Sequence, residues 1–487
     1  MVKPGWTKQL ARRLLRAGSA DLAGLVSAVR PDAAPQPGLF TYHVHPPGGS
    51  RILHLRIEAD GRGTLLIDVG DVVHLNATAA LLAKMALDSR GRREATAALQ
   101  RVGADRNKVD RDVQFVFELI DHLTTTTETC PTCGLNSAHQ KDLFSAPVNA
   151  PYKADLALTY ACNNSCGHCY NEQGRGGTLS LTPDEWKHVL DRLHRVGIPH
   201  IIFTGGEPTL HTDLAELIAY ARELGMVTGV NSNGRRFADN DFACAISQAG
   251  LNHLQVTLQS HRSAVHNAMT GAISFDETVA GIRNALNLGL HTITNTTLTQ
   301  KNEDGAEDTV DFLHDLGLTT FAMNGMIHSG SGCGFQDAIA EKCLAPILVA
   351  VRERAVDLGM RFLWYTPTPY CELSPVELGL GAKRCNAGQY TIAIEPDGSV
   401  LPCQSYYHSA GNILENDWSE IWDSGLLRSF RDRVVDPQGA GLPEKCWDCP
   451  DLPVCGGGCR IAREASGDIR NRAHEVRMPE VCSGDLR

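Results

Sequence analysis

The sequence lacks the features that would place the chain in a membrane or outside the cell. No stretch approaches the roughly 18 consecutive apolar residues that a membrane span needs. The first 30 residues contain no continuous apolar core and no small-residue cleavage site, so they predict an amphipathic helix and not a signal peptide. These absences predict a cytoplasmic protein with no membrane partner.

Positive charge and aromatic residues are also scarce. The 487 residues carry a formal net charge of −11, and aromatics make up 6 % of them. A chain-wide basic surface for nucleic acid is therefore absent, and we expect no nucleic-acid partner. Hydrophobic residues make up 43 %, which excludes a mainly disordered chain.

Cysteine, in contrast, is abundant. The chain contains 16 cysteines. In a reducing cytosol, clustered thiols more often bind metal ions or iron–sulfur clusters than form disulfides. The spacing of the cysteines therefore carries the functional information.

Hydrophobic periodicity divides the chain into six parts. Short apolar strands alternate with helices in the largest part, and six such units predict an α/β fold with a parallel sheet, either a partial barrel or doubly wound. The expected parts are an N-terminal helix and linker (1–37), a small domain (38–124), a linker with a Cys-x2-Cys pair (125–151), the α/β domain (152–365), a connector (366–384) and a Cys-rich domain (385–487).

The expected elements can be placed along the sequence. In the small domain, strand-like alternation over 51–75 precedes helices at Ala77–Asp88, Arg93–Val102 and Lys108–Leu123. Strands of the α/β domain are expected at Asp155–Tyr160, His200–Thr204, Met226–Asn231, His253–Leu258, Thr292–Thr297 and Thr320–Asn324. The pair Cys130 and Cys133 is compatible with a structural, zinc-binding or redox role.

Three cysteines follow the first of these strands. Cys162, Cys166 and Cys169 form a Cys-x3-Cys-x2-Cys loop. Three thiolates can hold three irons of a 4Fe–4S cube and leave the fourth iron open to a small molecule. A zinc site with His168 as fourth ligand, or free thiols, are alternatives at this point.

A second motif ends the next strand, and with it the chain resembles the radical SAM superfamily. This motif is Gly205-Gly206-Glu207-Pro208. The resemblance implies a partial (β/α)6 barrel in which the three cysteines bind a 4Fe–4S cluster and S-adenosylmethionine (SAM) chelates its unique iron. It also implies that the loop contacts the methionine amino group, with the Glu207 carboxylate facing that amine and the glycines allowing close approach of the backbone.

Further SAM contacts are expected where strands end, because ligands of βα barrels lie at the C-terminal ends of their strands. Ordinary loop polarity is the alternative for each residue. The candidates are Ser232, Asn233, Ser260 and Asn295, together with His168, which occupies the position where the family usually has an aromatic ring beside adenine.

The C-terminal cysteines resemble the SPASM extension of radical SAM enzymes. The resemblance implies two auxiliary clusters, a nearer one on Cys385, Cys403 and Cys459 and a distal one on Cys446, Cys449, Cys455 and Cys482. Many relatives have another Cys where this chain has Thr391, so the nearer cluster has three assigned ligands. It keeps an open iron, or it borrows Cys371 or another ligand. Two zinc ribbons are the alternative.

Residues 38–124 resemble PqqD-like domains, small winged-helix-like α+β modules that bind the leader of a precursor peptide. The matching stretches are Gly63–Leu87 and Asp110–Leu123. A small sheet with an exposed edge can accept a peptide as an added strand. Residues 51–124 carry 11 Lys/Arg and 11 Asp/Glu, so no basic surface supports DNA binding. A purely structural domain is the other alternative.

Together these resemblances imply a peptide-modifying radical SAM oxidoreductase. An external one-electron donor such as flavodoxin or ferredoxin would reduce the cluster, SAM would yield a 5′-deoxyadenosyl radical, and a ribosomal peptide would be crosslinked or otherwise oxidised. Alternatives are a sulfatase-maturing type of enzyme, decarboxylation of a tetrapyrrole, and a non-catalytic iron–sulfur carrier or peptide scaffold. No residue is assigned as a substrate-directed acid or base.

Overall fold

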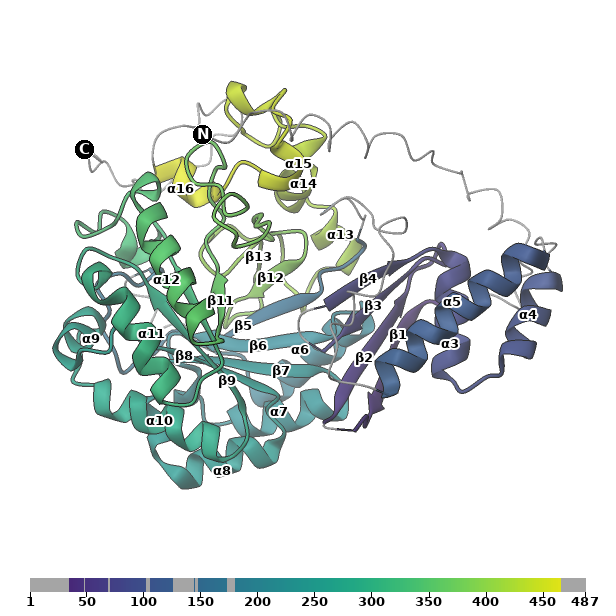
Figure 1. Ribbon diagram of the computed structural model, residues 1–487, viewed down its shortest axis with the longest axis horizontal. Helices are drawn as coiled ribbons and strands as arrows, with labels where there is room; N and C mark the ends of the chain where they lie inside the picture. The colour runs from purple at the N-terminus through teal and green to yellow at the C-terminus, as the bar shows by residue number, and fades with distance from the viewer. Residues whose placement is uncertain are drawn as a thin grey trace. The chain divides into compact units, whose positions relative to one another are not determined.

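The computed structural model describes residues 35–47, 49–68, 71–101, 106–125, 144, 148–172 and 180–465 (Figure 1). The chain separates into two compact units, 1–134 and 135–487. The expected N-terminal helix, Cys130, Cys133 and Cys482 lie outside the described residues. Within the described part, no helix combines the length and apolar character that a membrane crossing requires.

The N-terminal unit contains a four-stranded antiparallel sheet in the order β1-β2-β3-β4 and three helices. Its elements are β1 (Gly38–Val44), β2 (Arg51–Ile57), β3 (Gly63–Ile67), β4 (Asp71–Leu75), α3 (Ala77–Leu87), α4 (Arg92–Arg101) and α5 (Arg106–Thr125). The three predicted helices are confirmed. The strand region was predicted incompletely, because β1 pairs along its whole length with β2 although its sequence lies between Pro-rich stretches.

This unit has its own core. Alternate residues of β2 and β3, such as Leu53, Leu55 and Leu65, are fully buried together with residues of α3 and α5. Asn76 begins α3 as an N-cap, since its side chain accepts a hydrogen bond from the backbone N–H of Ala79 at 2.8 Å. The unit therefore contains the hydrophobic core that a separate domain requires.

The larger unit is built on a nine-stranded sheet in the order β11-β10-β9-β8-β7-β6-β5-β12-β13. The six predicted parallel strands are present, and three strands that were not predicted extend the sheet at its two edges. The bounds are β5 (Lys153–Thr159), β6 (His200–Gly205), β7 (Val227–Ser232), β8 (His253–Thr257), β9 (His291–Thr297), β10 (Thr320–Asn324), β11 (Arg361–Trp364), β12 (Thr391–Ile394) and β13 (Val400–Leu401). Strand β12 runs parallel to β5, which joins the Cys-rich region to the α/β domain.

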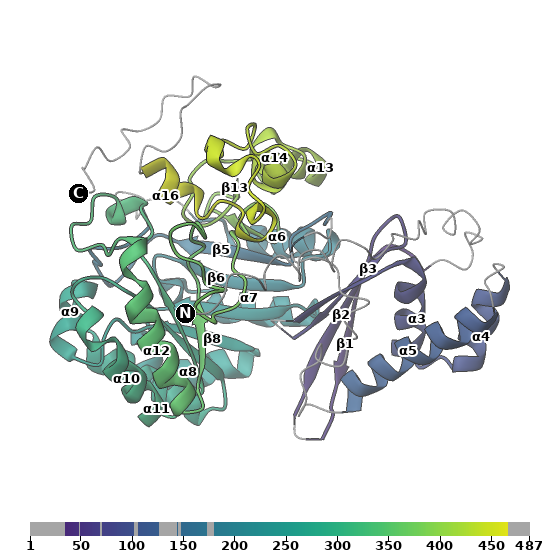
Figure 2. The same ribbon diagram turned by 45° about the horizontal axis from the view of Figure 1, so that its top comes forward.

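Helices cover one face of this sheet (Figures 1 and 2). Four short helices, α13 to α16, come after its last strand in the sequence. A capping box of Thr182 and Glu185 begins α6, and Pro183 occupies its first turn. The bounds are α6 (Pro183–Arg195), α7 (Leu214–Glu223), α8 (Asn240–Ala249), α9 (Ser263–Thr270), α10 (Phe275–Asn287), α11 (Ala306–Asp315), α12 (Ala345–Asp357), α13 (Trp418–Trp422), α14 (Gly425–Arg431), α15 (Leu452–Cys455) and α16 (Arg460–Ala465).

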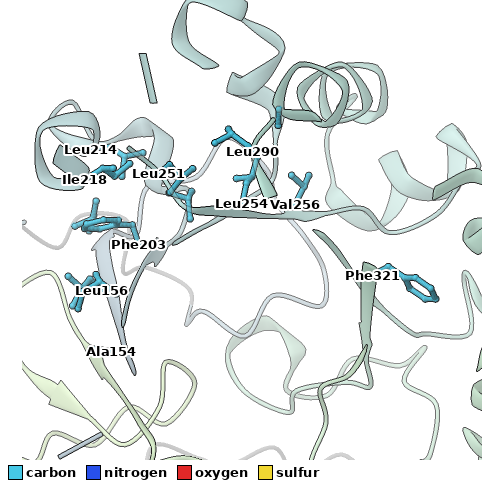
Figure 3. Close-up of a cluster of buried hydrophobic side chains, with 14 of the residues drawn as sticks. Ala154, Leu156, Phe203, Leu214, Ile218, Leu251, Leu254, Val256, Leu290 and Phe321 are labelled. Atoms are coloured by element: carbon cyan, nitrogen blue, oxygen red, sulfur yellow. The ribbon is translucent and has the colours of Figure 1, made fainter. Parts of the chain in front are cut away.

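The two faces of the strands differ in polarity. Side chains such as Leu156, Phe203 and Leu254 join the buried apolar cluster between sheet and helices (Figure 3). Because successive side chains of a strand alternate between faces, Asp155 and Thr204 point to the opposite face, where they are nevertheless almost fully buried. A polar, enclosed interior of this kind is suited to a polar ligand.

Candidate active site

The three-cysteine loop follows β5 directly, as predicted. Its conformation is fixed by neighbouring loops that also follow strands. The Asn233 side-chain amide donates to Asn163 Oδ1 at 2.6 Å, and Arg235 donates to the Asn163 carbonyl and, at 3.1 Å, to Asn164 Oδ1. The Ser165 backbone N–H donates to the Thr270 carbonyl at 2.9 Å. Hydrogen bonds from neighbouring loops therefore fix the backbone and the asparagine side chains of this loop, and none of these bonds uses a cysteine thiol.

The predicted glycine motif lies against the start of this loop. The backbone N–H of Gly206 donates to the Thr159 carbonyl at 2.7 Å, and that of Glu207 donates to the Ala161 carbonyl at 2.8 Å. Gly205 has φ +129°, and a Cβ there would overlap the Thr159 carbonyl oxygen. A Cβ at Gly206 would stand 2.5 Å from the Ala161 carbonyl oxygen. Only glycine fits at both positions, so the two motifs form one backbone unit.

The Glu207 side chain has internal partners that the sequence did not predict. Its carboxylate accepts hydrogen bonds from Ser232 Oγ (2.8 Å), Thr209 Oγ1 (2.7 Å), the Thr209 N–H (3.1 Å) and the Asn233 N–H (2.7 Å). The side chain is 1 % exposed, and burial raises the pKa of its carboxyl while these hydrogen bonds lower it. The carboxylate thus connects the ends of β6 and β7, and its contact with an amine of the ligand stays a prediction. Pro208, also buried, starts the 3-10 turn that follows.

Three of the polar candidates also have partners within the protein. Ser232 Oγ donates to Glu207 and accepts from the Gly234 N–H at 2.9 Å. Asn233 uses its backbone N–H for Glu207 and its amide for the cysteine loop. Ser260, fully buried, accepts from the Arg262 N–H at 3.1 Å. The structure places Ser232 and Asn233 beside the two motifs, where their hydrogen bonds position Glu207 and the cysteine loop.

His168 and Asn295, in contrast, each present a buried polar atom with no hydrogen-bond partner among the described residues, Nδ1 and Oδ1 respectively. Gln259 Oε1 accepts from the Thr297 N–H at 2.9 Å, so its amide nitrogen is the atom that donates to His168 Nε2 at 3.0 Å. Burial lowers the pKa of His168 to about 4, so the ring is neutral and its proton resides on Nδ1. Each of these two buried polar atoms can take a hydrogen-bond partner from a ligand that reaches it.

The same contacts argue against zinc on the cysteine loop. His168, the predicted fourth zinc ligand, is bonded to Gln259 and lies edge-on to Phe335. Across the residues that the structure describes, no three His, Cys, Asp or Glu side chains gather closely enough to hold a single metal ion. Three thiols on one loop, beside a glycine cradle, fit the four-iron cube.

The thiols of the loop influence one another electrostatically. Burial, together with Cys162 and Cys169, raises the pKa of Cys166 to about 12, and burial also raises the pKa of Cys162 and Cys169. The three thiols are therefore protonated at neutral pH until they bind iron, and iron binding releases their protons.

Tyr170 connects this loop to the Cys-rich region. Burial and the neighbouring thiols Cys169 and Cys403 raise the pKa of its phenol, which also hydrogen bonds Thr204. Tyr407 Oη donates to the Tyr170 carbonyl at 3.3 Å. Cys403, one of the predicted auxiliary ligands, and Cys169 thus both act on the phenol of Tyr170.

The auxiliary thiols fall into the two groups that the resemblance implies. Cys385 and Cys459 both contribute to the raised pKa of Cys403, and Cys385 helps to raise the pKa of Cys459 to about 11. Cys449 and Cys455 contribute to the raised pKa of Cys446. The first group is the predicted nearer set, and the second comprises the described members of the distal set.

Comparison with protein families agrees with both motifs. Residues 156–313 match the radical SAM superfamily. Residues 385–450 match SPASM, an iron–sulfur cluster-binding domain, which overturns the alternative of two zinc ribbons.

Curated relatives match about two-thirds of the chain. The mycofactocin maturase MftC of Mycolicibacterium smegmatis is 28 % identical over 342 residues, which cover 66 % of this chain and 82 % of the relative. The PqqA peptide cyclase of Streptomyces rochei is 29 % identical over 341 residues, covering 66 % of this chain and 88 % of the cyclase. The AdoMet-dependent heme synthase of Methanosarcina barkeri is 28 % identical over 349 residues, which cover 66 % of this chain and 95 % of the synthase.

Solved structures show the same fold. SuiB of Streptococcus suis, bound to its precursor peptide SuiA, matches with a TM-score of 0.63 at 17 % identity, over 88 % of this chain and 98 % of SuiB. Residues 135–487 make up less than three-quarters of the chain, so this match extends into the N-terminal unit. anSMEcpe with bound AdoMet matches with a TM-score of 0.52 at 17 % identity, over 64 % of this chain and 90 % of that protein.

Proposed function

We propose that this chain, which matches the radical SAM superfamily over residues 156–313 and SPASM over residues 385–450, is a radical SAM peptide maturase. It cleaves SAM reductively and uses the radical to modify a ribosomally made precursor peptide. The observation that carries the proposal is the single backbone unit formed by the three-cysteine loop and the glycine motif.

When bound, SAM and the 4Fe–4S cluster supply the reductive cleavage that yields methionine and a 5′-deoxyadenosyl radical. Cys162, Cys166 and Cys169 hold the cluster. Gly205 and Gly206 give SAM access to the backbone beside it. The Nδ1–H of His168 and the Oδ1 of Asn295 offer the donor and acceptor for the nucleoside, whose base carries both functions.

Residues with internal partners keep this arrangement rigid. Glu207 joins the ends of β6 and β7, and Asn233 and Arg235 hold the cysteine loop. Ordering the site before the ligand arrives removes a cost from binding. An external one-electron donor, flavodoxin or ferredoxin, provides the electron, and the cytoplasm supplies both.

The substrate assignment rests on relatives and on the N-terminal unit. MftC and the PqqA peptide cyclase are named for peptide maturation, and SuiB was solved with a precursor peptide. The sheet of residues 38–75 has β1 and β4 as its edges, and an extended leader segment would add to such an edge through backbone hydrogen bonds. Cys385, Cys403 and Cys459 would hold the nearer auxiliary cluster, which would supply an acceptor for the electron left after peptide modification or a site for a substrate thiolate.

The test uses a short reading frame encoded beside the gene. Anaerobically reconstituted protein, a reductant, SAM and the encoded peptide should yield 5′-deoxyadenosine and a peptide whose mass has changed, for example by loss of two hydrogens. 5′-Deoxyadenosine without any change in candidate peptides would contradict the substrate assignment. Its complete absence from cluster-loaded protein would contradict the reaction and favour an electron carrier or scaffold.

A second substrate class has a specific observation in its favour, since the chain is 28 % identical to an AdoMet-dependent heme synthase. Decarboxylation of a tetrapyrrole would release carbon dioxide and would not need a leader-binding unit. Incubation with an iron–coproporphyrin in place of the peptide distinguishes the two. A sulfatase-maturing reaction would instead convert a Cys or Ser of a sulfatase peptide to formylglycine.

A further inference from the structure

Two arginine side chains are buried in the Cys-rich region and contact only uncharged acceptors. Arg384 and Arg433 are 3 % and 5 % exposed. Their guanidinium groups donate to four backbone carbonyls and to one side-chain amide oxygen, that of Gln389. A buried charge is unfavourable unless an opposite charge compensates it. The surroundings of these two cations therefore indicate what compensates them.

Two other arginines of the same region have carboxylate partners. Arg431 Nη2 lies 3.6 Å from Asp423 Oδ1, and Arg460 Nε donates to Glu464 Oε1 at 2.8 Å. Within the part of the chain that the structure describes, no carboxylate oxygen lies within ion-pair distance of the two buried guanidinium groups. Their charges are therefore left for a bound anionic group to compensate.

Arg384 connects the two groups of auxiliary thiols. It directly precedes Cys385 of the nearer group. Its Nη1 donates at 2.9 Å to the carbonyl of Pro453, two residues before Cys455 of the distal group. Gly456, with φ +64°, allows the side chain to approach, because a Cβ there would stand 2.5 Å from Arg384 Cγ. Arg384 Nε is buried without an acceptor among the described residues.

Arg433 reaches the same place from the end of α14. Its Nη2 donates to the Ala387 carbonyl at 3.4 Å, and its Nε donates to the Phe430 carbonyl at 2.5 Å. A Cβ at Gly456 would stand 3.5 Å from Arg433 Cδ, so both arginines pack against this glycine. Burial and the charge of Arg433 lower the pKa of Arg384 to about 10, which leaves Arg384 charged at neutral pH.

The segments that hold these arginines also carry ligands of the auxiliary clusters. Ala387 lies two residues after Cys385, and Gly456 directly follows Cys455. The two cations are thus fixed between the backbone of the nearer group and that of the distal group. Net charge around an iron–sulfur cluster is one of the quantities that set its reduction potential. A fixed positive charge favours the reduced form, which carries one more electron.

We propose that Arg384 and Arg433 are fixed counter-charges of the auxiliary clusters and raise the reduction potentials of these clusters. The proposal rests on the clusters of the proposed function and adds the residues that tune them. One electron passes from the modified peptide to a cluster, and no proton moves, because a guanidinium stays charged throughout. Hydrogen bonds to carbonyls hold both cations in place before the electron arrives. A higher potential makes the clusters better acceptors for that electron.

The experiment uses the full-length chain with Cys162, Cys166 and Cys169 replaced by Ala, so that only auxiliary clusters contribute to the spectra. Into this parent we introduce Arg433→Met, which removes the charge, or Arg433→Lys, which keeps it. Arg428→Met is the matched control, because Arg428 is an exposed arginine of α14 in the same region. After anaerobic reconstitution, iron and sulfide are quantified and a redox titration is followed by EPR.

We expect Arg433→Met to lower the midpoint potential of at least one auxiliary cluster. The ratio of reduced to oxidised cluster at a fixed potential should fall about tenfold, which corresponds to about 59 mV for a one-electron couple. Arg384→Met should act in the same direction, Arg433→Lys should shift the potential less than half as far, and Arg428→Met should match the parent. Parent-like potentials in both Met variants of the buried arginines would overturn the inference.

The cluster content of the variants gives a second criterion. Clusters in Arg433→Lys but not in Arg433→Met would support the requirement for a positive charge. Loss of clusters from both variants, or equal shifts of potential in both, would assign Arg433 a packing role and overturn the inference. A parent without auxiliary clusters would instead contradict the proposed function itself. Circular dichroism of the cluster-free proteins verifies that each variant folds.

Discussion

The three-cysteine loop and the auxiliary region use thiols in opposite ways. The loop takes all its thiols from eight consecutive residues, keeps Cys162 exposed and has a glycine cradle at its side. The auxiliary region draws thiols from residues far apart in the chain and buries one of them, Cys455. An open cluster needs a ligand path, whereas a closed one needs enclosure, as in open catalytic and closed structural zinc sites.

The largest effect should come from the loop. Cys166→Ala removes one of three cluster ligands, so formation of 5′-deoxyadenosine should fall below detection. The auxiliary clusters should persist, because their thiols lie in a separate region. Liquid chromatography measures 5′-deoxyadenosine, and iron analysis of the same sample measures the auxiliary clusters that remain. Retained SAM cleavage would break the distinction between the two regions.

The corresponding change in the auxiliary region should have a different outcome. Cys403→Ala removes a ligand of the nearer cluster, so the modified peptide should disappear while SAM cleavage stays within about tenfold of the parent. Mass spectrometry of the peptide and quantification of 5′-deoxyadenosine separate the two quantities. Equal loss of both would show that the regions act as one unit.

The glycine cradle should be sensitive to a single methyl group. Gly205→Ala places a Cβ against the Thr159 carbonyl at φ +129°, so we expect a loss of about 3 kcal/mol in the free energy of unfolding. Gly289→Ala is the control, since Gly289 has φ +72° but no atom within 4 Å of its Cβ position, and should cost about 1 kcal/mol. Denaturant titration measures both, and equal costs would contradict the close approach.

The smallest effect concerns the anchor behind the cradle. Glu207→Gln replaces an accepting oxygen with a donor that faces N–H or O–H groups, so stability should fall by about 2 kcal/mol. Glu223→Gln, on the exposed end of α7, should change it by less than about 0.5 kcal/mol. A Glu207 variant as stable as the Glu223 variant, but unable to bind SAM, would contradict the anchoring role and favour the predicted contact with the SAM amine.

The sequence predicted the parts of the site whose chemistry is local. Cys162, Cys166 and Cys169 share one loop, and six parallel strands follow from apolar runs between helices. The role of the Glu207 carboxylate was not predictable, because its partners Ser232 and Asn233 meet it only in the folded sheet. Strand β12 was missed because its four residues become a strand by pairing with β5.

One measurement tests the central claim most directly: the EPR spectrum of reduced, reconstituted protein recorded with and without SAM, alongside the Cys166→Ala variant. A four-iron cluster with an open corner should give a signal that changes when SAM binds, and this signal should be missing from the variant. A spectrum that is indifferent to SAM, or that is the same in both proteins, would contradict the assignment of the three-cysteine loop.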